Sequence, residues 1–270
     1  MNICFIGGGN MATALIGGLL GRGFSASLIS VVEINPDNRA RLQQEFAVRA
    51  VDNLADGVAG SELIVFAVKP QQLRDVAQQL APLLTGQLLL SIAAGIRAVD
   101  LARWAGSQNI VRAMPNTPAL IQSGMTGMYA MPAVDAVQRE AAQSVLAAVG
   151  DTLWLDDEAM IDAVTAISGS GPAYVFYLIE ALQSAAQELG FAADDARRLS
   201  VATFLGASKL AAASVDEISV LRERVTSKNG TTERALLSLA ENGVAAHIAQ
   251  AAQAAAARSR EMGDELGRAS

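Results

Sequence analysis

The chain has 270 residues, of which 51% are hydrophobic, 17% charged and only 4% aromatic. So much apolar material with so few charges excludes an intrinsically disordered chain and predicts one large or two modest domains. The net charge of −7 at pH 7 and the lack of any Lys/Arg run argue against a nucleic-acid partner.

Cysteine content and hydropathy narrow the class of protein further. Cys4 is the single cysteine, so no internal disulfide is expected, and no Cys/His cluster has the spacing of a metal site. The N-terminus lacks the basic flank of a signal peptide, and no stretch approaches the roughly 18 apolar residues that a membrane span needs. We expect a cytoplasmic protein without a membrane partner.

Short apolar runs alternate with helical segments through the first half of the chain. The runs predict buried strands over Ile3–Ile6, Leu28–Val32, Leu63–Val68, Leu88–Ile92 and Ile110–Met114. The segments between them predict helices over Met11–Leu20, Asp37–Phe46, Gln71–Leu83 and Ala98–Trp104. This alternation predicts a parallel sheet with right-handed crossovers and helices on both faces.

A glycine-rich turn follows the first predicted strand. Gly7, Gly9 and Ala12 form the pattern Gly-x-Gly-x-x-Ala between that strand and the first predicted helix, which is the context that the dinucleotide fingerprint requires. Gly7 permits the tight turn and Gly9 lets the backbone approach a pyrophosphate, while the helix N-terminus offers unpaired N–H groups to the anion. We therefore expect a Rossmann-type domain that binds a dinucleotide.

The second predicted strand leaves the choice between NAD and NADP open. Glu33 follows the fingerprint at about the distance of twenty residues where an acidic side chain normally holds a ribose 2′-hydroxyl and repels a 2′-phosphate. Asn35 and Arg39 lie beside it and could instead receive a phosphate.

Three later strands end in small residues or prolines. Ligands of an open parallel sheet bind at the carboxyl ends of its strands, so these segments are candidate walls for a nicotinamide ring, with ordinary strand-to-helix turns as the alternative. The segments are Ala67-Val68-Lys69-Pro70, Ser91-Ile92-Ala93-Ala94-Gly95 and Met114-Pro115-Asn116-Thr117-Pro118.

From about Glu158 the strand-like runs disappear. The remaining sequence predicts helices over Pro172–Leu189, Asp194–Ala213, Thr232–Glu241 and Val244–Leu266. We expect residues 1–155 to form the Rossmann domain and residues 156–270 an all-α domain. The alanine-rich run Ala245–Ala257 allows close helix contact, which favours a subunit interface over an exposed terminal helix.

The segment Ser227–Thr232 is a candidate anion site. Asn229 and Gly230 open the backbone so that successive N–H groups converge where a helix begins, and Ser227 adds a hydroxyl. An ordinary helix cap, with Thr231 or Thr232 as the N-cap residue, is the alternative.

The chain resembles the Δ1-pyrroline-5-carboxylate reductase family along nearly its whole length. The resemblance is carried by Gly7-Gly8-Gly9-Asn10-Met11, Ala67-Val68-Lys69-Pro70, Met114-Pro115-Asn116-Thr117-Pro118, Gly169-Ser170-Gly171-Pro172-Ala173-Tyr174 and Val225-Thr226-Ser227-Lys228-Asn229-Gly230-Thr231-Thr232. It implies reduction of a cyclic imino acid to L-proline with NADPH, or alternatively NADH. It also implies a helical oligomerisation domain that interlocks with a second copy, as a homodimer or a larger ring such as a decamer.

The resemblance also implies which residues touch each ligand. The family's cofactor contacts fall on Ile6, Gly7, Gly8, Gly9, Asn10, Met11, Asn35, Asn53, Ala67, Val68, Lys69, Pro70, Ile92, Ala93 and Ala94. Its substrate contacts fall on Ser227, Gly230, Thr231 and Thr232. Two departures stand out: Lys228-Asn229-Gly230 replaces the usual Pro-Gly-Gly, and Glu33 argues against a preference for NADPH.

The scarcity of acid–base side chains suits an imine substrate. The chain has one histidine, His247, which we assign to a surface or interface, and only three lysines. A protonated imine is its own electrophile, so the protein need only orient it against the nicotinamide. Thr232 is our candidate for the hydrogen bond to the ring nitrogen.

Two other classes of protein share part of this sequence pattern. A 3-hydroxyacid dehydrogenase shares this layout but places a catalytic lysine on the first long helix of the second domain, where this chain has Ala173–Tyr177. A non-catalytic dinucleotide-binding regulator would have no reason to keep Ser227–Thr232 as an anion-binding loop.

Overall fold

The computed structural model describes residues 1–268, and these residues form two compact units. One unit comprises Met1–Ser170 and the end of the chain from Ala255, and the other comprises Gly171–Ala254. The boundary predicted after residue 155 lies earlier than this division, and the prediction did not anticipate that the end of the chain rejoins the first unit.

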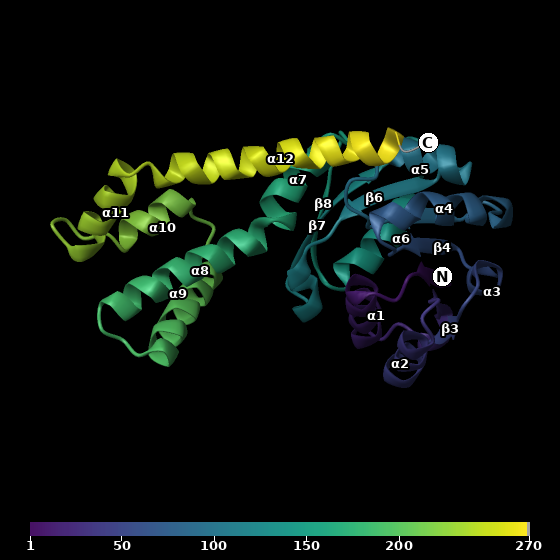
Figure 1. Ribbon diagram of the computed structural model, residues 1–270, viewed down its shortest axis with the longest axis horizontal. Coiled ribbons are helices and arrows are strands. Elements are labelled where there is room, and N and C mark those ends of the chain that lie inside the picture. The colour runs from purple at the N-terminus through teal and green to yellow at the C-terminus, as the bar shows by residue number, and fades with distance from the viewer. Residues whose placement is uncertain (269–270) are drawn as a thin grey trace. The chain divides into compact units, whose positions relative to one another are not determined.

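The first unit contains an eight-stranded sheet. Its strands are β1 (Ile3–Ile6), β2 (Ile29–Val32), β3 (Arg49–Val51), β4 (Leu63–Phe66), β5 (Leu88–Ser91), β6 (Ile110–Met114), β7 (Gly124–Ala130) and β8 (Gly150–Trp154). They lie in the order β3-β2-β1-β4-β5-β6-β7-β8. Figure 1 labels β3, β4, β6, β7 and β8 among them. Neighbouring strands are parallel except β6 and β7, which pair antiparallel. The order β3 to β6 is that of a dinucleotide-binding sheet, which confirms the predicted fold class.

Helices cover both faces of this sheet. They are α1 (Asn10–Gly21), α2 (Pro36–Phe46), α3 (Leu54–Val58), α4 (Pro70–Leu80), α5 (Ala98–Ala105), α6 (Ala136–Ala147) and α7 (Met160–Val164). Because successive strand residues point to opposite faces, Ile3 and Phe5 pack with one cluster, which includes α1 and α6. Cys4 and Ile6 pack with the other, which includes α4 and α5.

The end of the last helix forms hydrogen bonds and an ion pair with residues of α5, its N-cap residue and α7 in the first unit. Arg97 forms an ion pair with Asp264 at 2.7 Å, and Arg103 donates to the carbonyl of Gly267 at 2.9 Å. The Ser259 hydroxyl also donates to Asp162 at 2.6 Å. These contacts explain why the chain beyond Ala255 belongs with the sheet.

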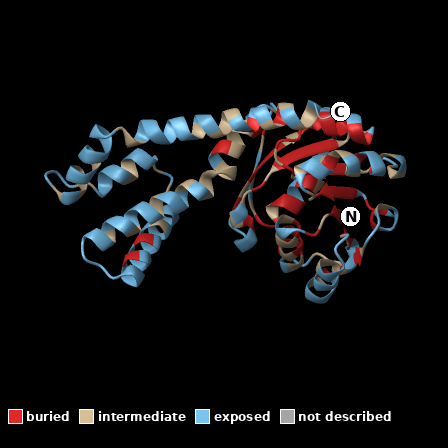
Figure 2. Ribbon diagram, in the orientation of Figure 1, coloured by how far each residue is buried: buried red, intermediate tan, exposed pale blue. Residues whose placement is uncertain are grey.

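The second unit is helical, as predicted. It is built from α8 (Gly171–Glu188), α9 (Ala193–Ala213), α10 (Ile218–Arg224), α11 (Thr231–Glu241) and the beginning of α12 (Val244–Arg268). Within residues 171–254 only Ala196 and Ser200 are buried, and most of this ribbon is coloured as exposed in Figure 2. These helices therefore lack the apolar core that the sheet unit has.

Within residues 1–268, no helix is both long and apolar enough to cross a membrane.

Candidate functional site

The turn between β1 and α1 has the geometry of a phosphate-binding loop. Gly7 has φ +98°, and a Cβ there would lie 2.8 Å from the carbonyl oxygen of Ala67, so this position requires glycine. Gly9 is the N-cap residue of α1, without a capping side chain, and a Cβ there would have no atom within 4 Å. The first amides of α1 therefore face open space in front of the turn, where an anion is favoured.

A cavity of about 760 Å³ opens beside this turn. It lies at the carboxyl ends of β1 and β4, where the strand order reverses, which is the usual ligand position in such sheets. Its volume is within the range of ligand pockets. The predicted cofactor residues that line it are Ile6, Gly7, Gly8, Gly9, Asn53, Ala67, Val68 and Lys69.

Other predicted cofactor residues lie outside the lining of this cavity. They are Asn10, Met11, Asn35, Pro70, Ile92, Ala93 and Ala94. Pro70 is the first residue of α4, and Asn35 is the N-cap residue of α2, its side chain accepting a hydrogen bond from the amide of Asn38 at 3.0 Å. Their contacts with a cofactor remain predictions.

Sequence reasoning missed part of the cavity wall. Asp52 follows β3, a strand of three residues that the apolar pattern did not reveal. One face of α4 also lines the cavity, through Gln72, Asp75, Val76 and Gln79. Their spacing places them on one face of a helix. Once a helix is predicted here, that spacing could have identified them as a group.

Glu33 follows β2 directly and lines this cavity. Its carboxylate accepts hydrogen bonds from the amides of Gly8 and Asn35 and from the side chain of Asn38. Arg39, the alternative phosphate ligand, instead donates to the carbonyl oxygen of Glu33 at 2.8 Å and lies 3.8 Å from Asp52.

The candidate substrate loop connects α10 and α11 in the second unit. Asn229 has φ +61°, so this position adopts the left-handed conformation expected of it. A Cβ at Gly230 would meet the Ser227 hydroxyl and lie 2.9 Å from the Ser227 carbonyl oxygen, which only glycine avoids. The loop thus closes tightly on Ser227 just before the helix begins.

The threonines after this loop do not cap the helix, so that alternative is wrong. The N-cap residue of α11 is Gly230, and no side-chain hydrogen bond caps it. Thr231 is exposed and Thr232 is half-buried in the first turn. One loop amide is already engaged, because Glu233 accepts a hydrogen bond from the N–H of Asn229 at 2.6 Å. The N–H of Gly230 is engaged as well, since it donates to the carbonyl oxygen of Ser227 at 3.0 Å. The amides available to an anion are therefore those of Thr231 and Thr232 in the uncapped first turn of α11.

Asn116 of the segment Met114–Pro118 contacts a π-helix over Thr165–Gly169 in the first unit. Asn116 donates to the carbonyl and hydroxyl oxygens of Ser168, both at 3.1 Å, and accepts from the amide of Met125 at 2.9 Å. Short π-helical turns are frequent at functional sites. The predicted helix start is confirmed, since α8 begins at Gly171 and has Pro172 in its first turn.

Tyr174 belongs to one of the segments that carry the family resemblance, and the sequence assigned it no role. Its hydroxyl is buried and has no hydrogen-bond partner within residues 1–268. Buried hydroxyls are normally paired, so this one is open to a partner outside the described chain. His247, which the sequence assigned to a surface or interface, is exposed on α12.

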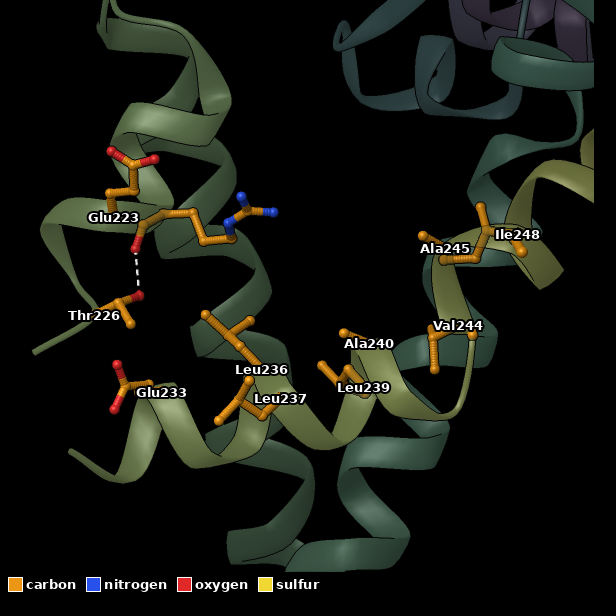
Figure 3. Close-up of a pocket in the computed structure, with 13 residues that line it drawn as sticks. Glu223, Thr226, Glu233, Leu236, Leu237, Leu239, Ala240, Val244, Ala245 and Ile248 are labelled. Carbon is orange, nitrogen blue, oxygen red and sulfur yellow. Dashed lines mark hydrogen bonds between the residues drawn. The ribbon is translucent and has the colours of Figure 1, made fainter. Parts of the chain in front are cut away.

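A second, apolar groove lies within the helical unit. It has a volume of about 810 Å³, and its lining includes Leu236, Leu237 and Leu239 of α11 and Val244 and Ile248 of α12, which are labelled in Figure 3. The Thr226 hydroxyl at its polar edge donates to the carbonyl of Arg222 at 2.6 Å. Nothing in this groove resembles a catalytic centre: its lining is mainly aliphatic.

Within residues 1–268, no group of three or more His, Cys, Asp or Glu side chains is arranged to hold a metal ion.

Comparisons with known proteins give concordant results. The family described as pyrroline-5-carboxylate reductase dimerisation matches residues 158–262, and the family described as NADP oxidoreductase coenzyme F420-dependent matches residues 2–95. The pyrroline-5-carboxylate reductase of Pseudomonas aeruginosa is 49% identical over 98% of both chains. That of Pasteurella multocida is 41% identical over 97% of both chains.

Solved structures extend this likeness to three dimensions. A pyrroline-5-carboxylate reductase from Coxiella burnetii has a TM-score of 0.94 and 37% identity, over 97% of this chain and 98% of that one. Plasmodium falciparum pyrroline carboxylate reductase, solved with NADP bound, has a TM-score of 0.86 and 27% identity over the same shares.

Proposed function

Because the chain belongs to the pyrroline-5-carboxylate reductase family, we propose that it reduces Δ1-pyrroline-5-carboxylate to L-proline. The reaction transfers a hydride from NADPH or NADH to the imine carbon and completes proline biosynthesis. The observation that carries this proposal is that the chain has both a dinucleotide-binding turn and a glycine-closed loop followed by the uncapped first turn of α11.

The cofactor is assigned to the cavity at the ends of β1 and β4. The open space in front of Gly9 and the uncapped N-terminus of α1 fit a pyrophosphate. Ala67, Val68 and Lys69 form the adjoining wall. The family match over residues 2–95 and the bound NADP of the Plasmodium falciparum relative support NADPH, with NADH as the alternative. When bound, the nicotinamide supplies the hydride.

The substrate is assigned to the loop Ser227–Thr232. A carboxylate there would accept hydrogen bonds from the Ser227 hydroxyl and from the amides of Thr231 and Thr232 at the positive end of α11. Gly230 would contribute by closing the loop, since its own N–H donates to the carbonyl oxygen of Ser227. The Thr232 hydroxyl, which caps nothing in its own helix, would hold the ring nitrogen. Since a protonated imine already carries the proton of the product amine, these residues orient the substrate and need not supply a proton.

The exposed apolar side chains of the helical unit and its family match both support self-association. Exposed apolar side chains such as Phe176, Tyr177 and Leu210 are 67%, 72% and 70% accessible in the single chain, and patches of this kind mark protein interfaces. The match to the dimerisation family, over residues 158–262, covers the whole of this unit. We extend the proposal to a cytoplasmic homodimer that builds a larger ring such as a decamer, which light scattering at micromolar concentration would test.

The decisive experiment follows nicotinamide absorbance with purified protein. Oxidation of NADPH or NADH should require Δ1-pyrroline-5-carboxylate and yield proline in equal amount. Dinucleotide binding without turnover would favour a non-catalytic regulator, and turnover with a 3-hydroxyacid or its ketone would favour the rival dehydrogenase. Either result would refute the proposed reaction.

A further inference from the structure

We infer that Glu33 sets the relative affinity of this chain for NADH and NADPH, by holding the adenosine ribose hydroxyls and disfavouring a 2′-phosphate. The inference rests on the proposed function and deepens it: the protein binds both dinucleotides, and Glu33 makes the binding of NADPH weaker relative to that of NADH.

Three hydrogen bonds fix the carboxylate of Glu33 beside the phosphate-binding turn. One oxygen, Oε2, accepts from the amide of Gly8 at 3.1 Å and from Nδ2 of Asn38 at 2.7 Å. The other, Oε1, accepts from the amide of Asn35 at 2.8 Å. Asn38 also donates to the carbonyl of Gly8 at 3.0 Å, which closes the network between the turn and α2.

The carboxylate remains available to a ligand despite these bonds. Glu33 is only half-buried and lines the cavity together with Gly8 and Gly9. Each carboxylate oxygen can accept about two hydrogen bonds, and Oε1 has one from the protein. A ribose hydroxyl can donate to it, whereas a 2′-phosphate has no proton to offer and would place like charges together.

The surrounding charges do not offset this repulsion. Three carboxylates line the cavity, those of Glu33, Asp52 and Asp75, against the single ammonium group of Lys69. Arg39 is the cation nearest in sequence, and its guanidinium is engaged with backbone carbonyl oxygens of Glu33 and Ile34. The same group lies 3.8 Å from Asp52. A dianionic 2′-phosphate would thus meet a negative field at this end of the cavity.

The test measures dissociation constants of NADH and NADPH by fluorescence titration without substrate. Glu33→Gln keeps the side-chain length and removes the charge, so the ratio Kd(NADPH)/Kd(NADH) should fall by at least about tenfold. Asp75→Asn is the matched control: it removes a charge from the same cavity but on α4, and it should change the ratio less than about threefold.

A measurement on the unaltered protein covers the case in which Glu33→Gln fails to fold. Raising the salt concentration screens like-charge repulsion, so NADPH should gain affinity relative to NADH as salt rises. 2′,5′-ADP should gain relative to ADP in the same way when each competes with NADH.

The outcomes separate this inference from the proposed function. A ratio unchanged in Glu33→Gln, an equal change in Asp75→Asn, or a relative loss of NADPH affinity in high salt would overturn the role of Glu33 and leave the reductase activity standing. Failure to bind either dinucleotide would contradict the proposed function itself.

Discussion

The carboxylate of Glu158 lies 2.8 Å from the guanidinium of Arg112, a side chain of β6 that is only 5% exposed. The same oxygen of Glu158 accepts a hydrogen bond from the amide of Ala98 at 2.7 Å. Ala98 is the first residue of α5, whose N-cap residue Arg97 provides no capping hydrogen bond. Glu158 therefore serves as a cap from a distant part of the chain and neutralises a buried charge at the same time.

Loss of this carboxylate should destabilise the sheet unit strongly. Glu158→Ala leaves Arg112 buried without its partner and α5 without an acceptor at its first amide, which should lower the free energy of unfolding by about 2–4 kcal/mol. Urea denaturation at a fixed protein concentration measures the change, because stability of an oligomer depends on concentration.

Two further comparisons test whether the unpaired buried charge of Arg112 causes this loss of stability. Arg112→Met combined with Glu158→Leu removes both charges and should be more stable than Glu158→Leu alone, since no unpaired charge is buried. Glu45→Gln breaks the exposed ion pair with Arg41 and should cost at most about 0.5 kcal/mol. Equal losses in Glu158→Ala and Glu45→Gln would show that burial of Arg112 has no energetic role.

The sheet was predictable only where its strands are buried on both faces. β1, β4 and β5 are fully buried runs of apolar residues, except for the final Ser91, and such runs are visible in sequence. β7 contains Gly124 and Gly127, and β8 alternates half-buried and exposed residues at the sheet edge. Glycine is a poor strand former and an edge strand has no continuous apolar run, so both were missed. The antiparallel pairing of β6 and β7 was missed with them.

One missed helix did have a readable signal. Asp135 and Gln138 form a capping box at the start of α6, with each side chain accepting from the other's amide.

Some residues of the cavity can be recognised from the local sequence, whereas others depend on how distant strands pair. Gly7 and Gly9 are recognisable from local spacing, whereas the contact of Glu33 with Gly8 depends on the pairing of β1 with β2, which no local pattern specifies.

Gly230 should be indispensable to the substrate loop. A Cβ in Gly230→Ala would meet both the hydroxyl and the carbonyl of Ser227, so the loop must shift, and with it the Ser227 hydroxyl and the first amides of α11. We expect KM for the imino acid to rise about tenfold or more, while the dissociation constant of the dinucleotide, measured separately, is unchanged.

Gly206→Ala provides the control for this substitution. Gly206 lies within α9, and a Cβ there has no atom within 4 Å in the single chain. Alanine should be tolerated or slightly stabilising at that position because it favours the helix. If both alanine variants kept the original KM, the tight closure on Ser227 would have no part in substrate binding.

Thr232 should contribute one hydrogen bond to the bound imine. Thr232→Ala is expected to lower kcat/KM about tenfold, the equivalent of a bond of roughly 1.4 kcal/mol, and Thr232→Ser should retain most of the activity because it keeps the hydroxyl. Thr226→Ala is the matched control, since the Thr226 hydroxyl donates to the carbonyl of Arg222. Steady-state rates with saturating cofactor make the comparison, and an unaltered rate in Thr232→Ala would remove this residue from the mechanism.

Cys4 should make the stability of the sheet unit depend on pH in the alkaline range. Burial raises the pKa of its thiol from 9.0 to about 11, more than the hydrogen bond to Ser30 and the charge of Arg49 lower it. The folded state thus holds this proton more tightly than the unfolded state. The corresponding stability is present in full below pH 9 and is lost as the pH rises toward 11, by up to about 3 kcal/mol.

This contribution can be isolated by urea unfolding at a series of pH values. The measurement compares the unaltered chain with Cys4→Ala. Alanine leaves a small cavity and lowers stability at every pH, but it removes the titrating group, so its stability should decline less steeply above pH 9. The thiol should also resist a thiol reagent near neutral pH until the chain is unfolded, because the thiolate is the reactive form. Parallel pH profiles for the two proteins, or rapid labelling of the folded chain, would contradict the assigned burial of Cys4.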